Sequence, residues 1–271
     1  MAFSDDGKGV QRDDIMEQAM LLAKKHNKII VAHCEDESLL HGGYVHLGDY
    51  CKAHNHKGIC SESEFLQVQR DLELVKKTGC AYHVCHVSAK ESVEAIRQAK
   101  AQGLDVTCET APHYLLLDDS DLQEHGSFKM NPPLRSKQDK LALIQGVLDG
   151  TIDMIACDHA PHSEQEKSKG LKNSLFGIVG IETTFQLLYT YFVKTNGITL
   201  EKLLELIAIN PRKRFNIPFG GFSVWNLNET TRICSKDFLS KGKSTPFENY
   251  QVKSKNYLTV YNGKIIYKHQ I

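Results

Sequence analysis

The sequence lacks the marks of a secreted, disulfide-bonded or membrane-spanning protein. Its eight cysteines include no C-x-x-C pair and follow no regular spacing, so we interpret them as free thiols in a reducing compartment. No apolar run reaches the ~18 residues that span a bilayer, and the opening MAFSDDGKGVQRDD has neither the basic nor the apolar part of a signal peptide. We therefore predict a soluble, cytoplasmic protein without a membrane partner.

The chain also carries no formal net charge. Lys and Arg together number 33, as do Asp and Glu, so no overall field attracts the chain to nucleic acid, and we predict no such partner. The 271 residues suffice for one large α/β domain or two small ones, and length alone does not decide between them. Histidine, by contrast, is abundant, at 13 residues.

Residues 11 to about 210 alternate between helical and strand-like patterns. Ser61 and Glu64 resemble a capping box at the start of one helix. The pattern predicts strands at 28–34, 81–88, 104–110 and 151–157, and helices at 13–27, 61–79, 89–103, 137–150, 181–197 and 199–215. Apolar strands joined by helices predict a parallel sheet covered by helices, either in a (β/α) barrel or in an open doubly wound sheet.

The character of the chain changes at Pro218, where short strands and turns begin. Residues 257–268 form a predicted hairpin with Asn262 and Gly263 as its turn. We therefore divide the chain into an α/β region, residues 1–217, and a small β-rich segment, residues 218–271.

Three apolar strands finish in residues of the metal-ligand type. These are His33 in VAHCED, His86 in HVCHVS and Asp158 in IACDHAPH. In parallel α/β folds the loops at the carboxyl ends of the strands converge on one face and carry the chemistry. A single histidine at a strand end is more often a core residue, but three ligand-type ends on one face predict a metal site.

Other polar residues near these strands are open to more than one interpretation. Side chains alternate along a strand, so His83 and His86 face opposite ways; we choose His86, nearer the strand end, and interpret His83 as structural. By itself SDDG at 4–7 fits a solvated acidic turn. His113 is expected in a loop, as a ligand, a substrate contact or a residue behind the ligands. His159 receives no role beyond local structure.

With these residues in place, the chain resembles a dihydroorotase of the bacterial type I class, within the amidohydrolase superfamily. The motifs that carry the resemblance span nearly the whole chain: AFSDDG, VAHCED, YHVCHVS, FKMNPPLR, DGTIDMIACDHAPHSEQEK, FGIVGIET and FLSKGKSTPF. Related cyclic-amide hydrolases, the hydantoinases and allantoinases, share the metal ligands but not the combination of FKMNPPLR with DHAPH and a lysine after four further residues.

The resemblance implies a fold and a metal site. The fold would be a partial (β/α)8 TIM-type barrel, made of the later strands, with a small C-terminal β appendage. His33 and His86 would be ligands of one zinc, Asp6 the carboxylate that bridges two zinc ions, and Asp158 a ligand of the other. Zinc binds imidazole and carboxylate readily, which agrees with these residue types.

The resemblance also implies a reaction, the reversible hydrolysis of dihydroorotate to N-carbamoyl-aspartate in pyrimidine biosynthesis. Asp158 would be the catalytic base, which passes a proton to the departing ring nitrogen. Asn131, His162 and the backbone around Phe176 and Gly177 would hold the substrate.

Family members carry a long stretch with an H-x-H pair before the segment that matches AFSDDG. No H-x-H lies between Met1 and Asp6, so the chain resembles the carboxyl-terminal portion, and we expect its activity to need a separate N-terminal half. Two alternatives stay open. The chain could be a non-catalytic homologue that serves as a structural partner of aspartate transcarbamoylase, or a hydantoinase- or allantoinase-like cyclic amidase. A homo-oligomer is a further expectation.

Overall fold

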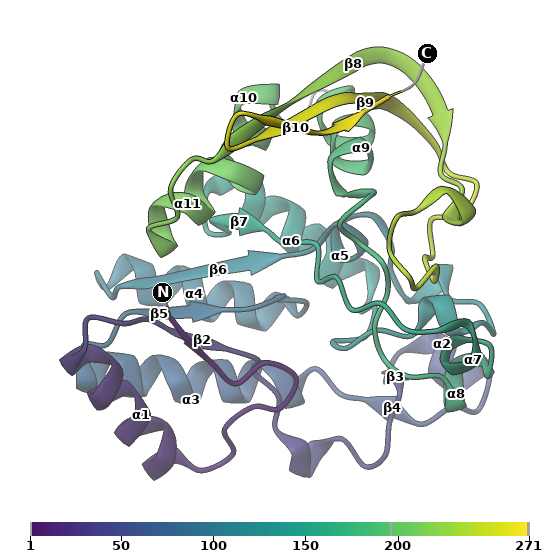
Figure 1. The fold of residues 1–271 in the computed structure, drawn as a ribbon. Helices are drawn as coiled ribbons and strands as arrows, with labels where there is room; N and C mark the ends of the chain where they lie inside the picture. Colours follow the sequence, from purple (N-terminus) through teal and green to yellow (C-terminus); the bar gives the residue numbers. More distant parts are fainter. Residues whose placement is uncertain (1, 196, 270–271) are drawn as a thin grey trace.

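The computed structural model describes residues 2–195 and 197–269, and its main feature is a parallel sheet of five strands (Figure 1). The strands are β1 (Phe3–Ser4), β2 (Ile30–Ala32), β5 (Tyr82–Val84), β6 (Val106–Thr110) and β7 (Met154–Ile155). They lie side by side in the order in which the chain makes them. Within the described residues this sheet has no reversal of strand order, so it differs from a doubly wound sheet.

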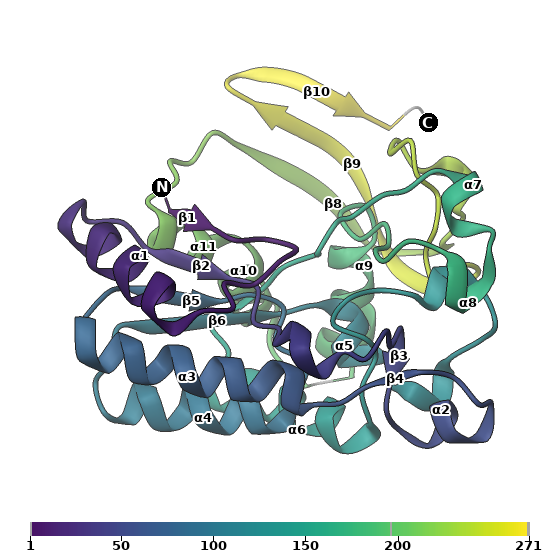
Figure 2. The same ribbon diagram turned by 90° about the horizontal axis from the view of Figure 1, so that it is seen from below.

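Helices cover one face of this sheet. They are α1 (Asp13–Lys25), α3 (Glu62–Thr78), α4 (Lys90–Ala101) and α6 (Lys137–Asp149), and each packs beside the next in chain order. Figure 2 shows α3, α4 and α6 as a layer beneath the strands. The core lies between helices and sheet, where Tyr82 and Val84 are buried and the Tyr82 hydroxyl donates to Asp71 Oδ2 of α3 at 2.6 Å.

Because strand side chains alternate, the residues between those core residues face away from the helices. His83 is one of them, and its Nδ1 lies 2.8 Å from Thr107 Oγ1 of the neighbouring strand. Its Nε2 lies 3.2 Å from Glu109 Oε2. This second face of the sheet is therefore polar, unlike the face that the helices cover.

Shorter elements surround the sheet. They are β3 (Val45–His46), α2 (Asp49–Ala53), β4 (Gly58–Ile59), α5 (Pro112–Leu116), α7 (Glu164–Lys167), α8 (Gly170–Asn173), α9 (Thr184–Leu188), α10 (Leu200–Leu204) and α11 (Asn210–Phe215), with 3-10 turns at Glu37–Leu39, Asp119–Asp121, Gly126–Phe128 and Ser235–Asp237. The strands β3 and β4 pair in parallel as a separate ribbon.

The last part of the chain forms an antiparallel sheet of three strands, β8 (Gly221–Arg232), β9 (Gln251–Tyr261) and β10 (Lys264–Lys268). In Figure 1 it lies across the top of the view, near α9 and α10. The predicted hairpin turn is confirmed, because Asn262 and Gly263 both have positive φ, at 47° and 73°, as a type I′ turn requires.

Several sequence predictions need correction. The strands are shorter than expected, because the ligand-bearing residues after Ala32 and Val84 leave the ladder. His113 lies in helix α5 and not in a loop. The two helices predicted at 181–197 and 199–215 are each interrupted by a π-helical turn, at Tyr189–Val193 and Glu205–Ile209. Residue 196 of the first prediction, like residues 1, 270 and 271, lies outside the described residues.

The capping box predicted at Ser61 is wrong. Ser61 is the residue before α3, but within the described structure its side chain makes no capping hydrogen bond, and Glu64 is directed elsewhere, as described below. All eight cysteines lie in the described part and are free thiols. No helix of the described residues is long and apolar enough to cross a bilayer.

Candidate metal and substrate site

The predicted ligands lie where strands of the main sheet end. His33 directly follows Ala32 of β2, while His86 and Asp158 lie two and three residues after the ends of β5 and β7. His86 and Asp158 both have positive φ, at 35° and 45°, a conformation that is uncommon for residues with a side chain. Such backbone conformations cluster at functional sites, where the surrounding structure holds them in place.

The structure brings Asp6, His33 and His86 together. Their ligand atoms all lie within 4.8 Å of one another. His33 Nδ1 and His86 Nε2 face each other at 3.0 Å, and the two buried rings meet edge to face. Two imidazole nitrogens and a carboxylate oxygen that converge in this way fit a zinc ion, which binds nitrogen at about 2.0–2.1 Å. The residues present therefore suit zinc, the metal that the family resemblance implies.

Asp158 lies outside this group of three but is coupled to it by charge. Burial raises the pKa of the Asp158 carboxyl; His86 opposes the rise, and the negative charge of Asp6 adds to it. Burial lowers the pKa of His86, and the neighbouring His33 lowers it further. The site thus holds a carboxylate that accepts protons more readily than an exposed aspartate and an imidazole that is held neutral, as metal ligation requires.

Two carboxylates that the sequence analysis did not single out hold the predicted residues. Asp5 Oδ1 accepts a hydrogen bond from the backbone N–H of His33 at 2.8 Å, so only the second aspartate of SDDG belongs to the metal group. Glu35 Oε2 lies 3.5 Å from His33 Nε2, and Glu35 Oε1 accepts from Asn131 Nδ2 at 2.9 Å. Glu35 thereby links a predicted metal ligand to a predicted substrate residue.

The side chain of Asn131 is left half-satisfied by this arrangement. Its amide nitrogen is used by Glu35, while its buried Oδ1 has no hydrogen-bond partner among the described residues. A buried acceptor without a partner is unfavourable, and such atoms in native structures need an explanation. A ligand that donates a hydrogen bond at this point would supply the missing partner.

The other predicted substrate residues lie on two loops that pair with each other. His162 Nε2 lies 2.8 Å from the carbonyl oxygen of Phe176, and the N–H of Ala160 donates to Ile178 at 3.0 Å. Gly177 has a φ of 121°, and a Cβ there would lie 2.6 Å from Ala160 Cβ, so only glycine fits this crossing. The loop after β7 therefore carries both Asp158 and His162 beside the Phe176 segment.

Lys167 connects these loops through hydrogen bonds to backbone carbonyl groups, a role that the sequence analysis did not predict. Its buried Nζ donates to the carbonyl oxygens of Lys129 at 3.0 Å and Leu175 at 2.7 Å, while the N–H of Gly177 also donates to Lys129 at 3.0 Å. The sequence motif already included this residue, since Lys167 is the lysine that follows DHAPH after four further residues.

Three further histidines lie near the site. The backbone N–H groups of Gly180 and Ile181 lie 3.3 and 3.4 Å from His159 Nδ1, which agrees with a role in local structure. Burial lowers the pKa of His113 to about 3, and the charge of His86 adds to this effect, so His113 is a neutral residue near His86. His83 makes a second group of ligand type with Cys85 and Glu109, within 4.8 Å, and its structural role stays a prediction.

Comparison with known proteins finds similar sequences that share one description. A family model described as dihydro-orotase-like matches residues 1–92. A dihydroorotase of Fusobacterium nucleatum subsp. nucleatum is 50% identical over 98% of this chain, and one of Bacillus pumilus is 47% identical over 98%. The chain spans only 65% and 64% of the length of these two relatives.

A solved structure has a fold similar to that of this chain. The L-hydantoinase (dihydropyrimidinase) of Arthrobacter aurescens superposes with a TM-score of 0.86 and 27% identity, over 99% of this chain and 63% of that protein. The parallel sheet and the C-terminal antiparallel sheet are therefore those of a mixed α/β fold of the hydantoinase kind.

Proposed function

Because the chain belongs to the dihydroorotase-like family, we propose that its site takes part in the reversible hydrolysis of dihydroorotate to N-carbamoyl-aspartate. The observation that carries the proposal is the meeting of His33 Nδ1 and His86 Nε2 at 3.0 Å, with Asp6 in the same group of ligand atoms. The identity of 47–50% with proteins named dihydroorotase supports this substrate over that of a hydantoinase.

The proposal extends to the architecture. Five parallel strands in chain order, with helices on one face and polar side chains on the other, support a sector of a (β/α)8 barrel. The three-stranded sheet would then be an appendage, and the division between 217 and 218 falls just after α11.

We propose zinc as the metal, held by His33, His86, Asp6 and Asp158. When bound, zinc ions polarise a carbonyl and make hydroxide available near neutral pH. The protein's own part is to keep the imidazole of His86 neutral and to aim the ring nitrogens of His33 and His86 at one point. Burial achieves the first for His86, and the backbone hydrogen bond from His33 to Asp5 contributes to the second.

Asp158 would move the proton of the reaction. Its raised pKa makes the carboxylate a better acceptor for the proton of the attacking water than an ordinary aspartate, and the same group can then donate that proton to the departing ring nitrogen. Because Asp158 both accepts the proton from water and donates it to the ring nitrogen, the reaction needs no second general acid.

Asn131 and His162 would hold the substrate in position. Glu35 fixes the amide of Asn131 so that Oδ1 remains to accept a hydrogen bond from a ring N–H. His162 is tied to Phe176, so the two loops present a backbone edge of fixed shape. Dihydroorotate carries both ring N–H groups and carbonyl oxygens, which suit such a set of partners.

The substrate is tested by comparing kcat/KM for dihydroorotate and for hydantoin with zinc-loaded protein. Because the chain spans about two thirds of its relatives, the assay is run with the chain alone and with the portion of a relative that it does not span. The proposal predicts a preference for dihydroorotate. A preference for hydantoin would assign the site to the related cyclic amidases instead.

A further inference from the structure

The loop that carries His86 is held by a buried network that the proposed mechanism does not use. Glu64, in the first turn of α3, is 3% exposed, and Arg135, which follows the MNPPL segment, is 4% exposed. Their charged groups form an ion pair, with Arg135 Nη2 3.5 Å from Glu64 Oε2. Two charges are rarely buried this deeply unless they are paired and further hydrogen-bonded.

Glu64, in helix α3, accepts hydrogen bonds from residues at the start of helix α4. Its Oε1 accepts from the backbone N–H groups of Ser88 at 3.1 Å and Ala89 at 3.0 Å, and from Ser92 Oγ at 2.7 Å. The residue before α4 is Ala89, which has no side-chain acceptor for a cap. Glu64 therefore fixes the two residues that lead into α4, while Asp139 Oδ1 accepts from the N–H of Lys90, the first residue of the helix, at 2.9 Å. Negative charge is favourable at this end of α4.

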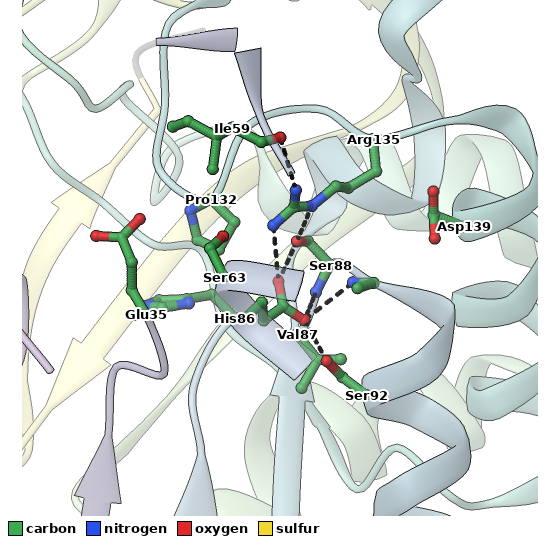
Figure 3. A network of polar contacts seen from close by, with 12 residues as sticks. Glu35, Ile59, Ser63, His86, Val87, Ser88, Ser92, Pro132, Arg135 and Asp139 are labelled. Atoms are coloured by element: carbon green, nitrogen blue, oxygen red, sulfur yellow. Dashed lines mark hydrogen bonds and ion pairs between the residues drawn. The ribbon is translucent and has the colours of Figure 1, made fainter. Parts of the chain in front are cut away.

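Arg135 completes the arrangement from the opposite side (Figure 3). Its Nε donates to Ser88 Oγ at 3.0 Å, and the Ser88 hydroxyl donates in turn to Glu64 Oε2. Its Nη1 donates to the carbonyl oxygens of Cys60 at 3.0 Å and Ile59 at 3.4 Å. One guanidinium thus joins β4, the loop after β5 and the segment that begins with Asn131.

The position of Ser88 connects this network to the site. Ser88 lies two residues after His86, whose backbone has a φ of 35°, and His86 itself lies two residues after Val84, the last residue of β5. On its other side the loop is fixed by β6, since the N–H of Val87 donates to Glu109 at 2.8 Å. Arg135 in turn lies four residues after Asn131, so the same network bears on a ligand and on a substrate residue.

We propose that Glu64 and Arg135 are positioning residues, which act through Ser88 to hold His86 at the metal and Asn131 at the substrate. The inference rests on the proposed function, because it takes His86 to be a zinc ligand. Outer partners of metal ligands set the orientation of the ligand, and their loss typically lowers metal affinity by 10- to 100-fold.

The test measures the Kd of the protein for Zn²⁺ by competition with a chelator, without substrate. Arg135→Lys keeps the positive charge opposite Glu64 but loses the planar fork that reaches Ser88 and Cys60 together. Ser88→Ala removes the shared hydroxyl. Both variants should raise the Kd about tenfold, and thermal unfolding measured in parallel shows whether they fold.

Ser92→Ala is the matched control. It also removes a hydroxyl that donates to Glu64, but from within α4 and not from the ligand loop. Its Kd should stay within about twofold of the original protein, because Glu64 keeps its other partners. Arg135→Lys and Ser88→Ala proteins that bind zinc as tightly as the original, or a Ser92→Ala protein that binds as weakly as they do, would overturn the proposal.

The two proposals fail in different ways. Zinc binding that weakens in Arg135→Lys, in a protein that does not convert dihydroorotate, supports the positioning role and contradicts the function. Turnover of dihydroorotate with an unchanged Kd in both variants supports the function and contradicts the positioning role. A protein that binds no zinc, either alone or with the portion of a relative that it does not span, contradicts both.

Discussion

At the scale of single residues, burial decides which groups stay neutral. His46, in β3, is 8% exposed, and its Nδ1 has no hydrogen-bond partner within the described structure. Burial, with a smaller contribution from Arg135, lowers the pKa of His46 from 6.5 to about 4. A histidine kept neutral in this way links protonation to folding.

The sign of that linkage gives a pH prediction. Between pH 6.5 and about 4 the unfolded chain binds a proton at His46 that the folded chain does not, so stability is full above pH 6.5 and falls as the pH drops toward 4. Relative to His46→Asn, the original protein should lose up to about 3 kcal/mol of unfolding free energy between pH 7 and 4. Urea denaturation at both pH values checks this, with the exposed His26→Asn as control. Parallel pH dependence of His46→Asn and the original protein would refute it.

Gly177 gives a prediction about the substrate loop. A Cβ at this position meets Ala160 Cβ and the Ala160 carbonyl oxygen at 2.6 Å, and φ is 121°. Gly177→Ala should therefore lower the unfolding free energy by about 1–3 kcal/mol and raise KM for dihydroorotate. Gly103→Ala is the control, because φ is 78° there but a Cβ meets no described atom within 4 Å. An unchanged KM in a Gly177→Ala protein with lowered stability would separate this loop from the substrate.

Single residues also show what a sequence can reveal. His33 and His86 were predictable together because parallel strands deliver their last side chains to one edge. Glu35 was not, since its partner Asn131 lies 96 positions away and nothing local marks the pair. Glu64 was misassigned for the same reason: its position fits a local capping box, and only the packing of α3 against α4 turns it toward Ser88.

At the scale of elements, the short helix α7 matters through the lysine that ends it. Burial lowers the pKa of Lys167 to about 8, and the charge of Lys129 adds to the effect. Its Nζ joins the carbonyls of Lys129 and Leu175, and so ties α7 to the segments that lead to Asn131 and Gly177. The helix therefore sets the distance between two substrate-binding segments.

Lys167→Met should loosen that connection. Two buried carbonyl oxygens would lose a charged donor, which typically costs 1–3 kcal/mol, so we expect KM for dihydroorotate to rise roughly tenfold while the Kd for zinc is unchanged. The exposed Lys169→Met serves as control and should change neither quantity. Steady-state kinetics measure KM, and zinc titration measures the Kd. A raised Kd for zinc with an unchanged KM would contradict this role of α7.

Periodicity predicted most of the regular elements but not their irregular ends. The amphipathic repeats of α1, α3 and α4 and the hairpin at Asn262–Gly263 are local features, so the sequence alone indicates them. The π-helical turns at Tyr189–Val193 and Glu205–Ile209 carry no comparable local signal, since they insert one residue without breaking the apolar pattern.

At the scale of the whole molecule, chain order and spatial order coincide across the main sheet. The alternation of strands and helices was predictable as a parallel α/β fold, whereas the absence of the strand-order reversal of a doubly wound sheet, within the described residues, needed the structure. The consequence for function is that β1, β2, β5 and β7 each deliver site residues to the same edge. Asp6, His33 and His86 thus come from separate parts of the chain and meet only when the sheet forms.

The most direct test of this account is the conversion of dihydroorotate to N-carbamoyl-aspartate by zinc-loaded protein, compared with Asp158→Asn. The assay is run with the chain alone and with the portion of a relative that it does not span. We predict conversion in at least one of these two mixtures, and a loss of roughly 10²- to 10⁴-fold in kcat for Asp158→Asn, because that variant cannot carry the proton. No conversion in either mixture, or an Asp158→Asn protein as active as the original, would contradict the account.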